Sequence, residues 1–393
     1  MASALFLLFL LFAPNWTAER PVFGLQIGGQ TDSVDVSRYL AEARAAEARK
    51  DWPAAELSYL QALKLAPASA EVLVNLGVVY NRQGKTDDAI GAFTCAAQLK
   101  PRLVAAQLNL GITYFKLRRF GAATIPLRRV LEVTPEESQA RKLLALSLIS
   151  LERFQDAVEQ LEVLNQKQPG DPPILQALGQ SYLRLKLYGR AVKVLEELVV
   201  IVPGSAQNHL SLGEALDNAS EPERAISEFR KAIEIDPRLV EANYALGYAL
   251  LKRGDNEEAA KHFAKELEIN PGMTLALFHL AKINLKRGEV NEAASQLTKV
   301  IETEPDFRPG LEALGQALLK KGEAAAAVEV LERAVRIDPK WPDGRVLLGR
   351  AYMAAGRKTE AKKEFDVAQR LGTEERRRLE QKVTGSNSRS PLK

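Results

Sequence analysis

The sequence predicts an all-α solenoid, a fold in which one helix pair is repeated along most of the chain. Three observations support this fold class. Prolines recur every 34 residues, an alanine follows each proline 22 residues later, and a leucine follows each proline nine residues later. The prolines are Pro67, Pro101, Pro135, Pro169, Pro203, Pro237, Pro271, Pro305 and Pro339. Three registers of this length without a gap indicate tandem copies of one structural unit.

Each copy is expected to contain two helices. In residues 240–273 apolar residues recur at helical spacing, the stretch Arg253 to Asn256 interrupts them, and a second helical pattern ends at Asn270. Pro271 cannot continue that helix, and it disfavours helical geometry in the residue before it. Every repeat should therefore end at the same place. Ten repeats of 34 residues follow one another: 36–69, 70–103, 104–137, 138–171, 172–205, 206–239, 240–273, 274–307, 308–341 and 342–375.

Small residues stand where the two helices of a repeat should cross. Position 8 of a repeat is glycine or alanine in repeats 2 to 10, and position 20 is alanine in every repeat, from Ala55 to Ala361. A larger side chain at either position would force two closely crossing helices apart. A pair of this size cannot cover its own apolar face, so neighbouring repeats must stack.

These positions resemble the tetratricopeptide repeat, with Leu at position 7, Gly at 8, Ala at 20, an aromatic residue or Leu at 24 and Pro at 32. The resemblance covers residues 36–375 and implies that the helices form a right-handed superhelix. Ten helix pairs make twenty helices, and a C-terminal capping helix is expected after them. The first repeat departs from the pattern, because Glu42 stands where leucine is usual. A polar residue there is expected at the end of a solenoid, where the outer face meets water.

The chain ends are expected to lie outside the repeats. An apolar run from Ala4 to Ala13 fits a secretory signal peptide over 1–18, although no Lys or Arg precedes it; a buried helix or an uncleaved anchor are the alternatives. This predicts export, to the periplasm, the medium or the secretory route of a eukaryote, with no membrane span once the signal is removed. Residues 19–35 are predicted as a linker, 374–384 as the capping helix and 385–393 as a disordered tail.

Composition argues against several kinds of chemistry. With 54 basic and 50 acidic residues, the net charge of +4 is too small for a dedicated nucleic-acid binder. The single cysteine, Cys95, excludes an internal disulfide and a four-thiolate zinc site, and we expect it to be a small packed residue. His262 has Glu258 and Glu266 four residues to either side, but ordinary helix solvation explains this pattern better than a metal site. His209 and His279 are expected on helix surfaces. No catalytic residue, cofactor or metal site is predicted.

The candidate binding surface comes from positions 5, 9 and 12 of the first helices, which share one helix face. The resemblance implies that this face lines a concave groove. It carries Tyr244, Tyr248, Leu251, Phe278, Lys282 and Leu285 in repeats 7 and 8, and Val74, Val78, Leu108, Ile112 and Phe115 in repeats 2 and 3. Packing between adjacent first helices is the alternative explanation for these residues.

The function expected from the sequence is a non-catalytic scaffold that holds a peptide or protein partner in this groove. The alternative is an accessory subunit of an envelope, secretion or polysaccharide machinery, which would recruit a separate enzyme or bind glycan. Lys252, Lys282 and Lys286 flank the aromatic residues of repeats 7 and 8. We therefore expect an acidic or C-terminal stretch of the partner beside an apolar anchor.

Overall fold

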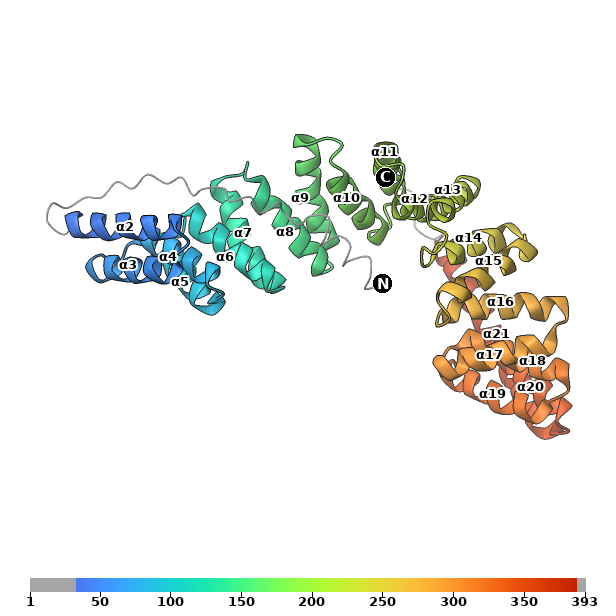
Figure 1. Cartoon of the computed structure of the whole chain (residues 1–393). Helices are drawn as coiled ribbons and strands as arrows, with labels where there is room; N and C mark the ends of the chain where they lie inside the picture. The colour runs from blue at the N-terminus through green and yellow to red at the C-terminus, as the bar shows by residue number, and fades with distance from the viewer. Residues whose placement is uncertain (1–32, 387–393) are drawn as a thin grey trace, which may run out of the picture. The chain divides into compact units, whose positions relative to one another are not determined.

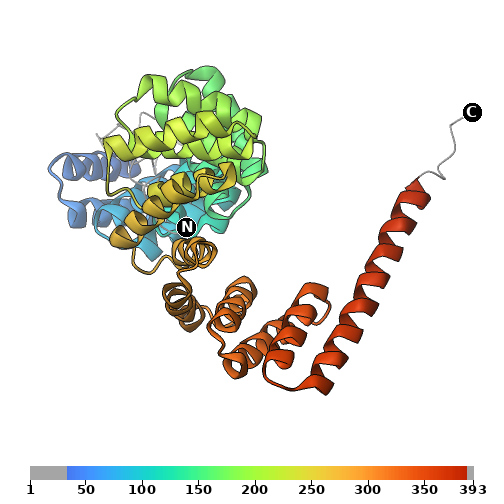
Figure 2. The ribbon, with the colours of Figure 1, turned by 90° about the vertical axis from the view of Figure 1, so that its right-hand side faces the viewer.

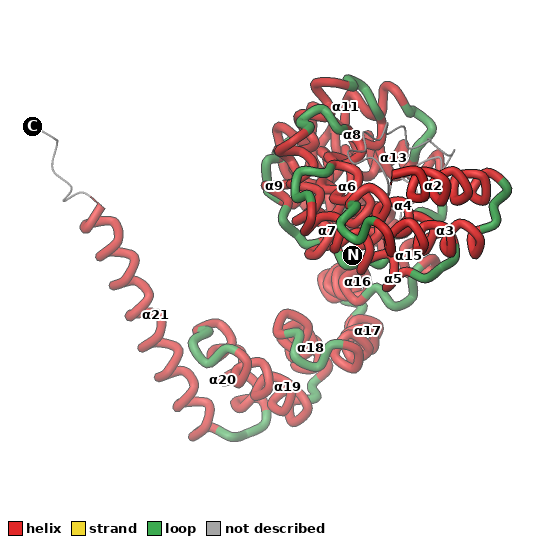
Figure 3. The backbone as a smooth tube through the Cα atoms, turned by 90° about the vertical axis from the view of Figure 1, so that its left-hand side faces the viewer, coloured by secondary structure: helices red, strands yellow, loops and turns green. Residues whose placement is uncertain are grey.

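The computed structural model describes residues 33–386, and this part of the chain consists of twenty helices joined by short turns, without a strand (Figure 1 and Figure 3). This confirms the predicted all-α solenoid of helix pairs. The chain divides into two compact units, Met1–Ala219 and Ser220–Lys393. Repeat 6 supplies the last helix of the first unit and the first helix of the second.

The first compact unit contains α2 (Ser33–Ala48), α3 (Trp52–Leu65), α4 (Ala70–Arg82), α5 (Thr86–Leu99), α6 (Val104–Lys116), α7 (Phe120–Val133), α8 (Ser138–Ser150), α9 (Phe154–Lys167), α10 (Pro172–Arg184), α11 (Tyr188–Ile201) and α12 (Ala206–Asn218). The second contains α13 (Pro222–Ile235), α14 (Ala242–Arg253), α15 (Asn256–Ile269), α16 (Thr274–Arg287), α17 (Val290–Thr303), α18 (Arg308–Lys321), α19 (Ala324–Ile337), α20 (Pro342–Ala354) and α21 (Lys358–Ser386). In each of the ten repeats, the second of the two helices begins at position 17.

The recurring proline ends the second helices as the sequence predicts. The residue before each proline is extended, with φ between −126° and −134° and ψ between 70° and 95°. This is the geometry that a following proline imposes, because its ring clashes with a helical residue before it. One internal proline behaves differently: α7 continues from Phe120 to Val133 through the buried Pro126.

A left-handed residue at position 15 makes the turn between the two helices of each repeat. It is glycine in five repeats, for example Gly254 with φ 101°, and a residue with a side chain in the others, for example Lys186 with φ 58°. Glycine adopts this conformation without steric cost, whereas a residue with a side chain adopts it at an energetic cost. The same turn is therefore built with two levels of backbone strain.

The small residues lie at the helix crossings, as expected. All ten alanines at position 20 are completely buried. A Cβ atom added at Gly77 would lie 2.5 Å from the Phe93 ring, and one added at Gly179 would lie 2.6 Å from the Leu195 side chain. Where position 8 is glycine, the close crossing of the helix pair thus depends on the absence of a side chain there.

The ends of the chain differ from the prediction. No separate capping helix covers residues 374–384, because α21 runs without a break from Lys358 to Ser386 and includes the first two residues of the predicted tail (Figure 2). Gly372 does not end the helix, since helix-forming residues flank it and no proline lies between it and the end of α21. At the other end α2 begins at Ser33, inside the predicted linker. The predicted signal peptide, the rest of the linker and residues 387–393 lie outside the described residues.

None of the helices in residues 33–386 is both long enough and apolar enough to cross a bilayer.

Candidate binding surface

The structure separates the eleven predicted contact residues by burial. Val74, Phe278 and Leu285 are buried, so their role is packing between neighbouring helices. Tyr248 and Lys282 are exposed. The others are partly buried: Tyr244, Leu251, Val78, Leu108, Ile112 and Phe115. The packing explanation therefore accounts for three of the eleven residues, and a contact with a partner stays a prediction for the rest.

In the second compact unit, five rings from α14, α15 and α16 form one group, which we call the aromatic cluster: Tyr244, Tyr248, Phe263, Phe278 and His279. The Tyr244 and Tyr248 rings are stacked, with centroids 6.1 Å apart and planes 17° apart. His279 lies within 5.2 to 6.1 Å of each of the other four rings. Tyr248 is the most exposed of them, with 39% of its surface accessible. Ring contacts of this kind add stability beyond the area they bury and hold each ring in place.

His279 is the member of the aromatic cluster that the sequence did not reveal. It was expected on a helix surface, but it is half-buried and stacks on Phe263 at 5.5 Å with an interplanar angle of 19°. Burial, helped by the Lys282 ammonium, lowers the pKa of His279 to about 4. The imidazole is therefore neutral at physiological pH and behaves as a fifth aromatic ring.

Lysines border the aromatic cluster on its exposed side. The Lys252 ammonium lies 5.8 Å from the centre of the Tyr248 ring, and the Lys282 ammonium lies 5.4 Å from that of Phe278. At these distances a cation is attracted to the face of the ring. Burial raises the pKa of the neighbouring Glu312, although Arg308 and Lys282 act in the opposite direction. The surface thus combines exposed aromatic area with ammonium groups.

The predicted face in the first compact unit has fewer aromatic contacts than the face in the second unit. Phe115 packs edge-on against Phe120 at 5.6 Å, which ties the end of α6 to the start of α7. The Asn81 amide donates to the Thr113 hydroxyl at 2.9 Å and links α4 to α6. Burial, followed by the nearby Arg82 charge, lowers the pKa of Lys116. This face is aliphatic and basic, and the aromatic cluster has no counterpart among these residues.

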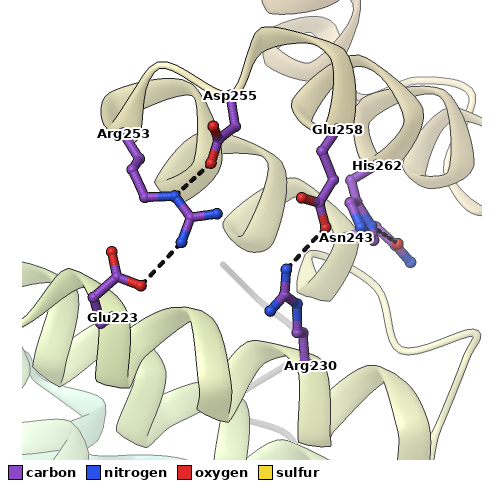
Figure 4. A network of polar contacts seen from close by, with 7 residues as sticks. All are labelled: Glu223, Arg230, Asn243, Arg253, Asp255, Glu258 and His262. Carbon is purple, nitrogen blue, oxygen red and sulfur yellow. Dashed lines mark hydrogen bonds and ion pairs between the residues drawn. The ribbon is translucent and has the colours of Figure 1, made fainter.

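The other histidines occupy structural positions. His262 was expected on an outward face, but it is half-buried with its Nδ1 2.9 Å from the Asn243 amide oxygen, and burial lowers its pKa. Its neighbour Glu258 accepts from Arg230 at 2.9 Å instead of facing the imidazole (Figure 4). His209, also expected on a surface, is buried with its Nε2 3.1 Å from the Pro203 carbonyl oxygen. Within residues 33–386 no three potential ligands come together as a metal site.

The remaining polar groups near α14 also link helices. Arg253 donates to Glu223 at 2.9 Å and to Asp255, and so connects α13 to the turn after α14 (Figure 4). Exposed pairs of this kind contribute little to stability, because solvent screens them. Cys95 is exposed, contrary to the expectation that it is packed. A hollow of about 650 Å³ between α15 and α16 shares no residue with the aromatic cluster.

Tandem antiparallel helix pairs of constant length, which cross at a glycine or alanine, define an α-solenoid repeat protein. The chain belongs to the tetratricopeptide repeat family: models described as "Tetratricopeptide repeat" match residues 40–103, 108–172, 177–239, 210–274, 250–317 and 318–379. Membership of this family supports a scaffold for protein–protein interaction as the class of function.

Several solved structures are similar to parts of this chain. "Crystal structure of MamA" matches with 24% identity and a TM-score of 0.39, over 41% of this chain and 95% of that one. "Crystal structure of YrrB: a TPR protein with an unusual peptide-binding site" matches with 20% identity and a TM-score of 0.41, over 48% and 98%. "Structure of Naa15/Naa10 bound to HypK-THB" matches with 16% identity and a TM-score of 0.49, over 86% and 63%. A search of curated proteins gave no match.

Proposed function

We propose that the protein is a non-catalytic scaffold and that the first helices of repeats 7 and 8 bind a peptide or protein partner at the aromatic cluster. The observation that supports this proposal is the exposed Tyr248 ring, which Tyr244 and His279 hold in place at 6.1 Å and 5.4 Å. A rigid aromatic ring offers a large contact area and loses little entropy on binding, which is why such rings dominate binding energies.

The lysines define the partner further. Lys252 and Lys282 lie beside the rings, and Lys286 follows one turn after Lys282 on α16. If an apolar side chain of the partner packs against the Tyr248 ring, the neighbouring residues of the partner lie near these ammonium groups. A carboxylate there gains charge-assisted contacts that a neutral group does not. The partner we propose is therefore a segment with an apolar anchor next to acidic residues or a C-terminal carboxylate.

The second candidate is an exported accessory subunit of an envelope, secretion or polysaccharide machinery. The apolar run from Ala4 to Ala13 favours it, because such a run directs export. The exposed face of Tyr248 would also suit a sugar ring. Mass spectrometry of the protein from its own host tests the location: loss of about the first 18 residues supports export, and an intact Met1 on cytosolic protein would exclude it.

Selection from a random peptide library tests the binding function, because the library samples many candidate partner segments at once. Peptides that bind the purified protein are measured against wild type, Tyr248→Ala and Ile337→Ala. Ile337, at the end of α19, is a matched control, because 42% of its surface is exposed and it belongs to a second helix. Tyr248→Ala should weaken binding by about 1–3 kcal/mol, or roughly 5- to 150-fold, and Ile337→Ala should not. Equal affinity for all three proteins would refute the proposal, and glycan binding in place of peptide binding would favour the second candidate.

A further inference from the structure

A buried carboxylate lies behind the aromatic cluster. Glu266, at position 27 of repeat 7, has 0% of its surface exposed. The equivalent residues are all apolar: Ala62, Ala96, Val130, Leu164, Leu198, Ala232, Val300, Ala334 and Ala368. Burying a carboxylate is costly unless it is paired or hydrogen-bonded. The burial of a carboxylate at position 27 of repeat 7 therefore requires a compensating interaction that the other repeats do not need.

The Glu266 carboxylate binds the start of α14. One oxygen accepts from the backbone N–H of Glu241 at 2.8 Å, and the other accepts from the N–H of Tyr244 at 3.2 Å. A negative charge at this place is favourable, because the N-terminus of a helix has unpaired N–H groups and a positive dipole end. Two backbone donors thus compensate for the burial of the charge.

This contact changes the local backbone of repeat 7. Glu241 is left-handed, with φ 72°, and α14 begins at Ala242, the third residue of its repeat. First helices in eight other repeats begin at position 1: Ala70, Val104, Ser138, Pro172, Ala206, Thr274, Arg308 and Pro342. The first helix of repeat 7 therefore starts two residues later, and the carboxylate binds the N–H groups at its start.

The Phe263 ring also lies farther from its glycine than the equivalent phenylalanine rings do. A Cβ atom added at Gly247 would lie 3.0 Å from the Phe263 ring, whereas the same distance is 2.5 Å at Gly77 and at Gly349, which also face a phenylalanine. Phe263 is the ring on which His279 stacks, and its centroid is 5.8 Å from that of Tyr244. The repeat whose first helix starts late is thus the one that carries most of the aromatic cluster.

We propose that Glu266 is a positioning residue for partner binding: by fixing the backbone at Glu241 and Tyr244, it sets where the Tyr244 and Tyr248 rings stand. The inference rests on the proposed function of the aromatic cluster. Glu266 does not itself touch the partner, but it determines the shape of the surface that binds the partner. Preorganised rings bind more tightly, because no ordering cost remains to be met on binding.

Three variants test the role of Glu266. Glu266→Ala introduces the residue that other repeats use at position 27, so α14 can start at residue 240 and the protein stays folded. Glu266→Gln keeps one acceptor oxygen and should have an intermediate effect. Val300→Ala is the matched control: it truncates the equivalent residue of repeat 8, which is fully buried but bonds to no helix start.

The readouts are the affinity for a library-selected peptide, the unfolding midpoint and hydrogen exchange at the Glu241 and Tyr244 amides. We expect Glu266→Ala to bind about tenfold more weakly and to exchange faster at the Glu241 amide, which loses its acceptor. The Tyr244 amide should stay protected, because it can donate to the carbonyl of residue 240 in the lengthened helix. The unfolding midpoint should be like that of wild type. Val300→Ala should show the reverse, a lower midpoint with unchanged affinity. A purely structural role for Glu266 would instead lower the midpoint and the affinity together.

The outcomes separate the two proposals. If Tyr248→Ala weakens binding and Glu266→Ala binds like wild type, the positioning role is refuted and the proposed function stands. If Tyr248→Ala binds like wild type, or if the library yields no peptide, the proposed function fails and the positioning role fails with it.

Discussion

The helix crossings allow a quantitative test of the fold, and Gly77→Ala in repeat 2 is the clearest case. The added Cβ would lie 2.5, 2.8 and 2.9 Å from three atoms of the Phe93 ring. Real Cβ atoms almost never approach a neighbour within 3.0 Å. The ring cannot move aside at low cost, because Phe93 is completely buried in the core of the repeat.

Two opposite terms determine the size of the effect. Overpacking a core costs about 1–3 kcal/mol, whereas replacing glycine by alanine inside a helix gains about 1 kcal/mol. Gly77→Ala should therefore destabilise the protein by up to about 2 kcal/mol. Gly91→Ala is the control in the same repeat: Gly91 is exposed on α5 with no atom within 4 Å of its added Cβ, so this change should stabilise by about 0.5–1 kcal/mol.

Urea unfolding followed by far-ultraviolet circular dichroism compares the two variants with wild type. Opposite signs are expected for the change in the free energy of unfolding. If Gly77→Ala is as stable as Gly91→Ala, the close crossing of α4 and α5 is not what requires glycine at position 8, and the steric explanation of the repeat is incorrect.

Three further predictions follow from the turns and the titrating groups. Gly254→Ala forces a side chain into a left-handed turn with open space around it, so the free energy of unfolding, measured in urea, should fall by about 1 kcal/mol. Lys186→Gly removes a side chain from the equivalent left-handed position and should raise the free energy of unfolding by up to about 1 kcal/mol. The pKa of His279 is about 4 in the folded protein and about 6.5 in the unfolded chain, so the neutral imidazole contributes its full stabilisation above pH 6.5. The free energy of unfolding should fall by about 1–2 kcal/mol as the pH drops from 6.5 to 4. His279→Phe should lose this pH dependence. Burial and a hydrogen bond to Glu162 raise the pKa of Tyr182 to about 12, so stability should fall between pH 10 and 12, and a Tyr182→Phe variant measured over the same range should fall less.

The repeat boundaries could be predicted because local steric rules fix them. The residue before each proline is extended, as Lys100 is before Pro101, whatever packs around it. Position 8 similarly needs a glycine or alanine wherever the helices cross closely. These constraints act through neighbouring residues or through one contact within a repeat, so a linear pattern records them.

The features that the sequence did not reveal depend on tertiary contacts. Glu266 looks like one of many charged residues on a second helix, and only the folded pair brings its carboxylate to the start of α14. His279 lies one residue away from the face defined by positions 5, 9 and 12, so helical periodicity did not include it. The sequence predicts a separate capping helix over 374–384, whereas α21 is continuous, because a single glycine at 372 between helix-forming residues costs only about 1 kcal/mol.

Hydroxyl-radical footprinting of Tyr248 with and without a library-selected peptide tests the central claim most directly. The ring is accessible in the free protein, and Ile337 on α19 has a similar exposed fraction and serves as the internal control. We predict that the peptide slows oxidation of Tyr248 several-fold and leaves oxidation of Ile337 unchanged. Unchanged oxidation of Tyr248 in the presence of a saturating peptide would contradict the assignment of the aromatic cluster as the binding surface.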